Sequence, residues 1–595
     1  MVQDILVEIR DAFCRHLEIM GVQNPEITLE RVSSVDFGDY SSNTALRYAK
    51  QVKINPLELA EKLVLSLQDV DINGVLKIKV VEPGFINIYF DSNTKLEHIA
   101  SIIEADERYG ANTSHAGETW VIEHTSPNPN KAMHLGHLRN NLVGMGIVRL
   151  LERTGATVTS DAIYNNRGIA IAKLMYGFLL YMRKSGDTPV SIEHWAANKS
   201  HWYSPVEKDL KPDLFVTECY VEGEKAMANP DAEEVTRQMV VDWEAGNENV
   251  WALWEHVLNF AYEGIHRTLS RLGSHWDKIW YEHEHYKEGK QYVADGLERG
   301  VFEKLEDGAV LTKLEETYGL PETVVLKKDG TSLYITQDLA LTDLKKKTYG
   351  AEKLVWVVGP EQSMAFKQLF AVCEQLGIGA REDFTHVTYG YVGLKESDGS
   401  FKKMSSRAGT VVLIDDVIDS VKNVIAERLT VDSKHSPEEI SELSEKLALA
   451  AVKFGFLRSD RNQDLSFDID QSVNIHGDSG MYVMYSYVRT QSIIRKFTGT
   501  VGTFEAPDEL GDESALIRVL QYYPDVIKKA QLDLSVHHIA QYLLELSSEF
   551  NSWYAKETIL DGSDMEPYRV VLASAVGTTL KNGLEILGIE TVSKI

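Results

Sequence analysis

The first part of the chain alternates short apolar runs of helical and of strand periodicity. Apolar positions in 57–67 recur at helical spacing, whereas 76–81 and 85–90 have the length and composition of short strands. Between the two strands stands Glu82-Pro83-Gly84, a sequence typical of a turn. The pattern therefore predicts an N-terminal α+β domain over residues 1–108.

The pattern changes where a second domain begins. Residues 118–124 are a candidate for a buried strand around Trp120-Val-Ile, and the apolar positions of 134–154 have helical spacing, with Gly155 placed to end that helix. Another buried strand at 354–358 precedes a further helical pattern at 363–376. Strand, loop and helix in this order are the units of a Rossmann-like, doubly wound parallel sheet, so an α/β fold class is predicted.

Other stretches differ from this alternation of strand and helix. Residues 180–290 are rich in Trp, Glu and His and lack an alternating pattern, which predicts a mostly helical insertion. Residues 324–328 and 333–336 resemble the strands of a hairpin around an Asp-Gly turn, and from Ile414 onward the pattern is almost continuously helical. The divisions expected after the first domain are a Rossmann-like domain at 109–395 that carries the insertion, a loop and connecting helical stem at 396–475, and an all-α domain at 476–595.

Composition narrows the class of protein. Hydrophobic residues make up 44% of the chain and charged residues 25%, an ordinary balance for globular domains. The net charge of −28 argues against nonspecific binding to nucleic acid, although it does not exclude a local basic track. Cys14, Cys219 and Cys373 are far apart, so neither a disulfide framework nor a cysteine zinc site is expected. No apolar run reaches the roughly 20 residues of a membrane span. The acidic N-terminus does not resemble a signal peptide, so a cytoplasmic protein is expected.

The strongest chemical signal is His134-Leu-Gly-His137 at the start of the 134–154 helix. A helix N-terminus that follows a parallel strand offers unpaired N–H groups and partial positive charge to an anion. Two histidines three residues apart lie on one helical face and can donate hydrogen bonds to phosphate oxygens, while Gly136 leaves room for a flat adenine ring. The alternative is a pair of surface histidines. No third metal ligand is evident nearby, so no metal site is expected.

A second signal is the basic segment Lys403-Met404-Ser405-Ser406-Arg407, which is flanked by glycines. A mobile basic loop can clamp a polyphosphate and stabilise the charge of its leaving group. Taken alone, a segment of this kind is more often a solvated basic loop.

Together these two segments, about 270 residues apart, resemble the HIGH and KMSKS signatures of class I aminoacyl-tRNA synthetases. The block 123–140 resembles the signature of the arginyl enzymes, and 330–338 resembles their substrate-helix motif. The resemblance extends to both ends of the chain. Segments 37–43 and 83–87 are similar to the family's N-terminal appended domain, and 482–495 and 580–590 to its helical anticodon-binding domain.

The resemblance implies an arginyl-tRNA synthetase that uses ATP with Mg²⁺, activates arginine and transfers it to tRNA(Arg). It also implies that activation needs bound tRNA, that no editing site exists, and that the enzyme is a monomer. The implied catalytic residues are His134, His137, Lys131 and Lys403. The implied ATP-binding residues are His134, Gly136, His137, Lys403, Met404 and Ser405. The implied arginine-binding residues are Glu123, Asn128, Tyr334, Asp338 and Gln362.

Within the implied arginine site, Asp338 and Glu123 would face the guanidinium, because a carboxylate can grip this planar fork with two hydrogen bonds. Tyr334 would pack beside it, and Asn128 and Gln362 would hold the polar end of the amino acid. Each residue also has an ordinary structural interpretation: Tyr334 as a core aromatic, Asp338 as a helix cap and Gln362 as a helix-start residue.

The sequence departs from the family pattern at two places. Ser406 and Arg407 stand where the family signature has a lysine and a serine, and we infer that Lys131, upstream of the histidines, supplies the missing charge. Residues 164–168 read Tyr-Asn-Asn-Arg-Gly where many members have Asp-Trp-Gly, so no role is assigned to this segment.

Two further groups suggest other chemistry. His283 and His285 could lie on one strand face and bind a metal, but no further ligand supports this interpretation. Residues 345–347, three consecutive lysines, are expected at a solvated helix end, with tRNA contact as the alternative. Rival functions are a small nucleotidyltransferase, a synthetase-derived RNA-binding protein without catalysis, and a class I synthetase for another amino acid.

Overall fold

The computed structural model describes residues 2–595 except 69, 71, 329, 331–332, 396–400, 404–411, 432–434, 503, 506 and 508–509, with only the backbone described for 401–403. The chain forms two compact units. One comprises Met1–Ala111, Asn474–Asp533 and His538–Ile595, and the other comprises Asn112–Val473 and Leu534–His537. None of the described helices is both long and apolar enough to cross a bilayer.

The N-terminal part of the first unit is an antiparallel sheet packed with helices. Its strand order is β1-β2-β4-β3. The strands are β1 (Glu30–Arg31), β2 (Tyr40–Ser42), β3 (Val75–Val81) and β4 (Phe85–Phe90). The helices are α1 (Val2–Ile19), α2 (Thr44–Val52), α3 (Pro56–Leu65) and α4 (Ser92–Ala105). The predicted helix at 57–67 and both predicted strands are thereby confirmed.

The same unit contains a bundle of helices from the end of the chain. They are α19 (Gly480–Lys496), α20 (Ser514–Gln521), α21 (Tyr523–Leu532), α22 (His537–Lys556) and α23 (Glu566–Ile586). Helix α23 is buried along most of its length. Glycines allow close approach of its neighbours, since a Cβ on Gly577 would lie 2.6 Å from Thr490 Oγ1 and one on Gly583 2.6 Å from a Leu543 methyl carbon. The all-α C-terminal domain is confirmed.

The second unit is built on a five-stranded parallel sheet of order β12-β11-β5-β6-β7. The strands are β5 (Thr119–Glu123), β6 (Thr157–Tyr164), β7 (Lys278–Tyr281), β11 (Lys353–Val357) and β12 (Phe384–Val387). The chain runs outward from β5 in one direction and later returns to build β11 and β12 on the other side. The strand order therefore reverses between β5 and β11, the place where ligands bind in sheets of this class.

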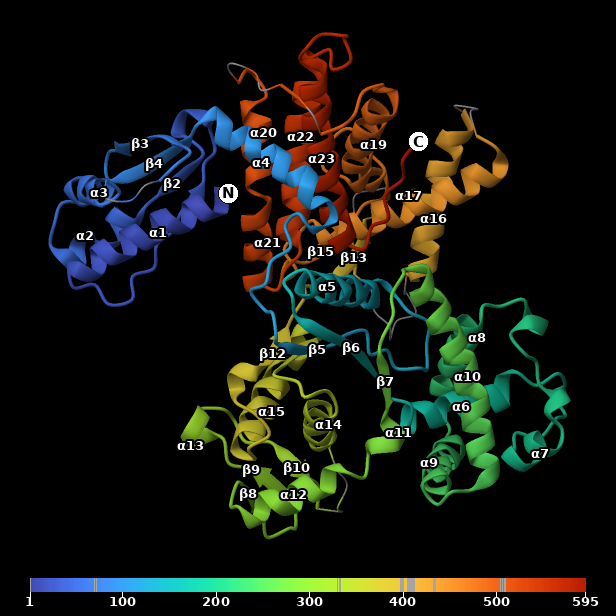
Figure 1. The fold of residues 1–595 in the computed structure, drawn as a ribbon. Helices are drawn as coiled ribbons and strands as arrows, with labels where there is room; N and C mark the ends of the chain where they lie inside the picture. The colour runs from blue at the N-terminus through green and yellow to red at the C-terminus, as the bar shows by residue number, and fades with distance from the viewer. Residues whose placement is uncertain are drawn as a thin grey trace. The chain divides into compact units, whose positions relative to one another are not determined.

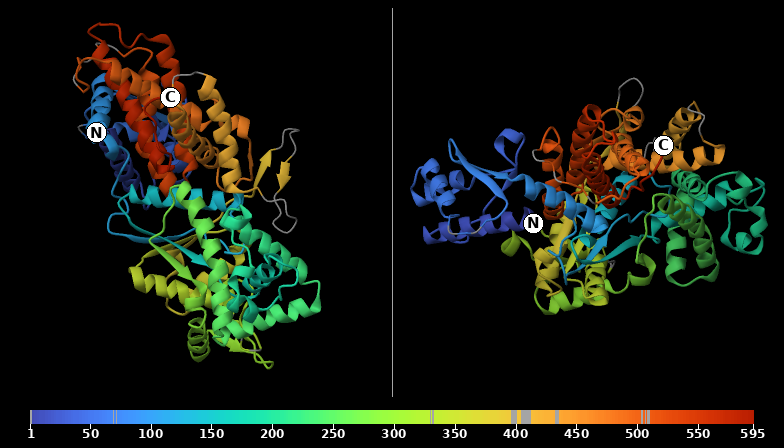
Figure 2. Two further views of the ribbon diagram at one scale, coloured as in Figure 1. Left: turned by 90° about the vertical axis from the view of Figure 1, so that its right-hand side faces the viewer. Right: turned by 45° about the horizontal axis from the view of Figure 1, so that its top comes forward.

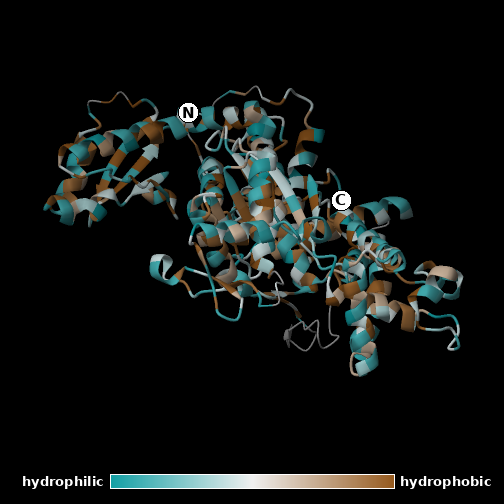
Figure 3. Ribbon diagram, turned by 90° about the horizontal axis from the view of Figure 1, so that it is seen from below, coloured by the Kyte–Doolittle hydropathy of each residue, from teal (hydrophilic) through white to brown (hydrophobic). Residues whose placement is uncertain are grey.

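Helices cover both faces of this sheet, as a doubly wound fold requires. Figure 1 shows α5 (Leu135–Glu152) on one face and α14 (Tyr334–Tyr349) with α15 (Ser363–Gln375) on the other. Trp356 of β11 packs with Leu369 of α15 and Leu339 of α14 in one apolar cluster. Many of the helices in Figure 3 carry hydrophobic beside hydrophilic residues, as expected where one side is buried. The predicted α/β class is confirmed.

The insertion between β6 and β7 is mostly helical, as predicted. Its helices are α6 (Ile169–Tyr181), α7 (Ile192–Ala197), α8 (Pro212–Ala226), α9 (Pro230–Glu244) and α10 (Glu248–Arg271), followed by α11 (Glu282–His285). Helices α6 and α8 pack backbone to backbone, because a Cβ on Gly177 would lie 1.9 Å from the carbonyl oxygen of Cys219. The predicted helical range also contains β7, which returns the chain to the sheet.

Two expectations of secondary structure are wrong. The second hairpin strand, 333–336, is instead the beginning of α14, because a short apolar alternation cannot be distinguished from the first turn of a helix. The first strand of the predicted hairpin is present as β10 (Val324–Leu326), but it pairs with β9 (Val310–Thr312). Strand β9 in turn pairs with β8 (Phe302–Lys304), and α12 (Gly289–Glu298) and α13 (Glu315–Tyr318) flank these strands.

The stem is the other exception, because its helices are interrupted by a strand. Helices α16 (Ile414–Val431), α17 (Pro437–Leu457) and α18 (Ile469–Ser472) are accompanied by β15 (Leu465–Phe467). Strand β15 pairs in parallel with β13 (Val392–Lys395), which pairs antiparallel with β14 (Phe401–Lys403) (Figure 2). Strands β13 and β14 follow β12 of the main sheet directly in the chain, whereas β15 comes after α16 and α17.

Candidate active site

The two histidines of the predicted nucleotide site form a reciprocal capping box at the N-terminus of helix α5. His134 is the N-cap residue, and its Nδ1 accepts the Gly136 backbone N–H at 3.1 Å. The backbone N–H of His134 is donated in turn to Nδ1 of His137 at 3.2 Å, and the ring centroids lie 3.9 Å apart. With both Nδ1 atoms accepting, each neutral ring carries its proton on Nε2, which can donate to a phosphate oxygen.

Burial keeps both rings uncharged at neutral pH. It lowers the pKa of His134 to about 4, with a smaller contribution from the positive charge of Lys131. Burial and then His134 and Lys131 hold the pKa of His137 well below its usual value. Burial also lowers the pKa of Lys131. The alternative of two surface histidines is thus wrong, because both rings are partly buried at the helix start. The role proposed for Lys131 stays a prediction.

Residues 412–414, which follow the second signature segment in the chain, lie beside the histidines. Leu135 donates its backbone N–H to the Val412 carbonyl at 3.3 Å, and Ile414 donates to the Met133 carbonyl at 3.2 Å, so that His134 and Leu413 form an antiparallel bridge. Lys403, the first residue of that segment, is the last residue of β14. Met404 and Ser405, with Ser406 and Arg407, lie outside the described residues, so their part in ATP binding stays a prediction.

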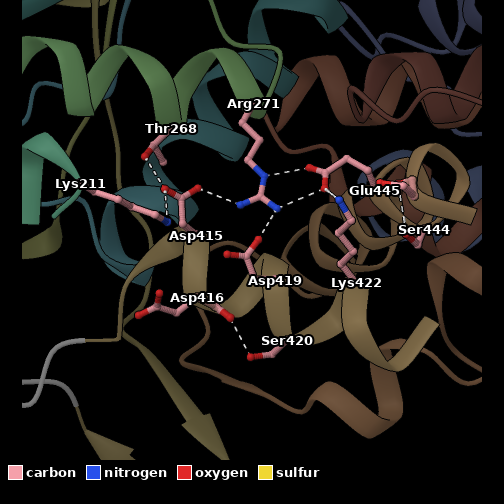
Figure 4. A network of polar contacts seen from close by, with 11 residues as sticks. Lys211, Thr268, Arg271, Asp415, Asp416, Asp419, Ser420, Lys422, Ser444 and Glu445 are labelled. Carbon is pink, nitrogen blue, oxygen red and sulfur yellow. Dashed lines mark hydrogen bonds and ion pairs between the residues drawn. The ribbon is translucent and has the colours of Figure 1, made fainter. Parts of the chain in front are cut away.

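An ion network fixes the first turn of α16, directly after this bridge (Figure 4). Asp415 accepts from Arg271 Nη1 at 3.0 Å, from Thr268 Oγ1 at 3.1 Å and from Lys211 Nζ at 3.3 Å. Arg271 also pairs with Asp419 at 2.6 Å and with Glu445 at 2.8 Å. The insertion is thereby tied to the stem helices α16 and α17 through Lys211, the N-cap residue of α8, and Arg271 of α10. No sequence motif indicated this network, because its members lie in three distant segments.

The five residues predicted to bind arginine line one pocket of about 440 Å³. Glu123 comes from the end of β5 and Asn128 from the following loop, while Tyr334 and Asp338 come from the first turns of α14 and Gln362 from the N-cap position of α15. The pocket therefore opens where β5 and β11 end, at the reversal of strand order. Their individual contacts with arginine stay predictions.

A buried lysine also lines this pocket. Lys345 is 1% exposed, and its Nζ lies 2.7 Å from Glu123 Oε2 and 2.9 Å from Asp161 Oδ2. Burial alone would lower the pKa of Lys345, but Asp161 and Glu123 outweigh burial and raise it. Burial raises the pKa of Asp161 to about 6, with Glu123 adding to the effect and Lys345 opposing it.

The expectation of a solvated lysine run is therefore wrong for Lys345. Lys345 follows Asp338 by seven residues, and Leu341 and Thr342 between them also line the pocket, so the four share one helix face. This spacing was the available signal for Lys345. Of the other two lysines, Lys346 binds Asp383 at 3.1 Å, and Lys347 is mostly exposed.

Asp338 carries the charge that the pocket leaves unbalanced. Burial, with the charges of Glu123 and Glu282, raises the pKa of Asp338 to about 7, while Lys345 opposes this rise. In the part of the chain that the structure describes, no hydrogen bond or ion pair reaches its carboxylate, whereas Glu123 already holds Lys345 and the Ser126 hydroxyl. A ligand cation would therefore be the partner of Asp338.

The ordinary structural interpretations fail for two of the pocket residues. Asp338 is not a cap, because Leu333 occupies the N-cap position of α14. Tyr334 is not a core aromatic, because it is 75% exposed. Gln362 does stand at a helix start, but its side chain makes no capping hydrogen bond. The sequence analysis missed Asn165 and Gln337, which line the same pocket.

The proposed strand face with His283 and His285 is wrong, since both belong to the short helix α11. His283 Nδ1 bonds with the Asn166 amide at 2.9 Å. Across the described residues, no three His, Cys, Asp or Glu side chains are arranged to hold a metal ion.

Comparison with known proteins gives a consistent result over the whole chain. Residues 3–90 match the arginyl-tRNA synthetase N-terminal domain, 98–469 the catalytic domain of class I tRNA synthetases (R), and 483–595 the DALR anticodon-binding domain. The arginine–tRNA ligase of Bacteroides thetaiotaomicron is 34% identical over 529 residues, covering 86% of each chain. That of Treponema denticola is 32% identical over 578 residues, covering 94% of each chain. The arginyl-tRNA synthetase structure from Thermus thermophilus superposes with a TM-score of 0.82 at 22% identity, covering 98% of this chain and 99% of that one. The chain belongs to the arginyl-tRNA synthetases of class I.

Proposed function

We propose that the chain is an arginine–tRNA ligase, which joins arginine to the 3′-terminal adenosine of tRNA(Arg) with ATP as the energy source. The observation that carries the proposal is the pocket at the end of β5, in which the carboxylate of Asp338 has no partner among the described residues. The loop that follows β5 leads directly to the histidine-capped helix α5. A guanidinium fits such a carboxylate, because it presents parallel N–H donors and stays charged at neutral pH.

In the first step the arginine carboxylate attacks the α-phosphate of ATP in line. A bond forms between a carboxylate oxygen and the phosphorus, the bond to the bridging oxygen breaks, and pyrophosphate leaves. His134 and His137 would donate Nε2–H groups to phosphate oxygens, and Gly136 would leave space for the adenine ring. Lys131 and Lys403 would supply positive charge to the triphosphate, and Met404 and Ser405 would contact the nucleotide. Positioning and electrostatic stabilisation would then provide the rate enhancement.

In the second step a hydroxyl of the terminal adenosine of tRNA attacks the carbonyl carbon of arginyl-adenylate, and AMP leaves. In the arginine pocket Asp338 and Glu123 would bind the guanidinium and Tyr334 would pack beside it. Asn128 and Gln362 would hold the amino and carboxyl groups of arginine.

We place Mg²⁺ with the nucleotide, where it would neutralise phosphate charge. The described residues contain no group of three protein ligands for it, so phosphate oxygens and water would supply its coordination. We further propose a cytoplasmic monomer that requires bound tRNA(Arg) for activation. Light scattering of the purified protein tests the monomer, and fractionation of cells tests the location.

The experiment that tests this function is pyrophosphate exchange into ATP, measured with each amino acid separately, with and without bulk tRNA. We expect exchange with arginine alone, and only when tRNA is present. Exchange with another amino acid would identify a sibling synthetase. No exchange under any condition, with tRNA binding retained, would identify an RNA-binding protein without catalysis.

A further inference from the structure

Arg167, in the segment that departs from the family pattern, is enclosed by side chains of the insertion. Its guanidinium carbon lies 3.9 Å from the Tyr286 ring centroid and 5.7 Å from that of Trp243. A carboxylate of Glu244 forms an ion pair with it, and the Arg167 side chain is only 13% exposed. Such enclosure fixes the position of a charge that would otherwise be free in solvent.

Arg167 is linked to the pocket proposed for the ligand arginine through one buried carboxylate, that of Glu282. Arg167 Nη1 lies 3.8 Å from Glu282 Oε1, and the Arg167 backbone N–H is also donated to Glu282. The side-chain amide of Gln337 donates to the same carboxylate. Gln337 lines the pocket and directly precedes Asp338. Arg167, Glu282 and Gln337 thus form a chain of contacts from the insertion to the pocket wall.

We propose that Arg167 is a positioning residue for arginine recognition, which acts through Glu282 to hold Gln337 at the pocket wall and to balance the negative charge behind Asp338. This inference rests on the proposed function of the pocket and goes beyond it, because Arg167 itself does not line the pocket. With its amide N–H taken by Glu282, Gln337 retains its carbonyl oxygen as an acceptor for a guanidinium N–H.

The charged groups around Asp338 determine how loss of Arg167 would shift the pKa of Asp338. Glu123 faces it from β5, Glu282 from α11 and Lys345 from its own helix, while Cys373 on α15 is a buried neutral thiol. Glu123 and Glu282 both make ionisation of Asp338 harder, whereas Lys345 makes it easier.

Helix α12, which also packs on α14, contributes Tyr292, and this residue binds Asp343 rather than Asp338. Arg167 lies beside Glu282 and opposes the effect of its charge. Without Arg167, the uncompensated carboxylate of Glu282 would raise the pKa of Asp338 further, and the ionised form that binds guanidinium would become rarer.

The backbone of the segment has supports other than Arg167, so the charge can be tested separately from the fold. Asn166 donates to the Tyr262 hydroxyl at 3.0 Å and accepts the backbone N–H of His283 at 3.2 Å. The Asn166 carbonyl also accepts the Trp254 indole N–H at 2.6 Å. Met at position 167 would keep the apolar contacts with the two aromatic rings and remove only the charge and its hydrogen bonds.

The experiment measures the KM for arginine and kcat of aminoacylation in the full-length protein from about pH 5.5 to 8.5. Arg167→Met should raise the KM severalfold, most strongly on the acid side, and should move the onset of the KM rise to higher pH. Glu282→Gln should move that onset to lower pH, and the double variant should return it toward the wild-type position. The kcat at saturating arginine should be retained in each case.

Two further variants separate charge from structure. Arg167→Lys keeps the charge and should keep the wild-type pH profile. Arg237→Met removes an exposed arginine of α9 that pairs with Glu233, and it should change neither KM nor its pH dependence. A KM that rises equally at every pH in Arg167→Met, or a double variant that does not restore the profile, would overturn this inference. A wild-type protein that does not charge tRNA with arginine would overturn the proposed function as well, so the two failures are distinguishable.

Discussion

Replacing Asp338 by Asn should have opposite effects on arginine recognition and on stability. The amide keeps the shape of the carboxylate but loses its charge and one acceptor site for a bidentate guanidinium. Truncating a buried, hydrogen-bonded charge pair costs about 2–5 kcal/mol, and we expect about 3 kcal/mol here because Glu123 remains. This energy corresponds to a roughly 100-fold loss of kcat/KM for arginine. The KM for ATP should not change.

The stability effect follows from the raised pKa of Asp338. Its value in the folded protein, about 7, is above the ordinary 3.8 of an unfolded chain. Ionisation of Asp338 therefore opposes folding; this penalty is absent below about pH 4, grows as the pH rises, and is complete above about pH 7. At about 1.4 kcal/mol per pKa unit, the penalty is at most about 4 kcal/mol. An Asp338→Asn variant does not ionise at this position and therefore lacks this penalty.

The assay is thermal unfolding at pH 5 and at pH 8, together with arginine kinetics for the same preparations. The Asn variant should unfold at a higher temperature than wild type, with the larger difference at pH 8. Asp343→Asn, on the same helix, is the matched control, because Asp343 holds Tyr292 and Lys347 and lies outside the pocket lining. It should lose stability and keep its arginine KM. A variant at position 338 that is less stable than wild type at pH 8, or whose arginine KM is unchanged, would refute the reasoning.

The remaining predictions concern the pH dependence of the wild-type arginine KM and substitutions of Lys131, Lys345 and Arg271. The arginine KM of the wild type should rise about tenfold per pH unit below about pH 7, as Asp338 becomes protonated; a flat profile down to pH 5.5 would contradict this. Lys131→Ala should lower the rate of pyrophosphate exchange far more than it weakens arginine binding measured by calorimetry, and equal rates in mutant and wild type would end that assignment. Lys345→Met should lower the free energy of unfolding by about 3–5 kcal/mol, because two buried carboxylates lose their cation, with Lys345→Arg milder; equal stability of the Met variant would contradict it. Arg271→Met should slow exchange while leaving arginine affinity intact, since it releases Asp415 at the start of α16; unchanged exchange would show that the anchor is dispensable.

The sequence predicted those parts of the site that are encoded in short, contiguous segments. His134 and His137 could be placed because a helix start requires local residues, and the pocket residues Glu123 and Asp338 came from two recognisable blocks. Lys345 was misassigned because its partners Glu123 and Asp161 lie on strands 222 and 184 residues earlier, and only the folded sheet brings them beside α14.

The same limit explains the errors of secondary structure. Residues 333–336 belong to the beginning of a helix although they resemble a strand, because three or four residues do not define a period. Strand β15 escaped notice because it is short and is stabilised by pairing with β13, far from it in sequence. Arg167 could not be interpreted at all from its sequence neighbours, since Tyr286, Trp243 and Glu282 surround it only after the insertion has folded.

The backbone bridge between Met133–Leu135 and Val412–Ile414 has a consequence for the order of events during synthesis. The histidine segment leaves the ribosome first, and the residues that complete its main-chain pairing are translated about 280 codons later. Until then the corner at which we propose that phosphate binds lacks one side in the nascent protein. A truncated product that stops at residue 395 should therefore fail to bind ATP even if its parallel sheet has formed.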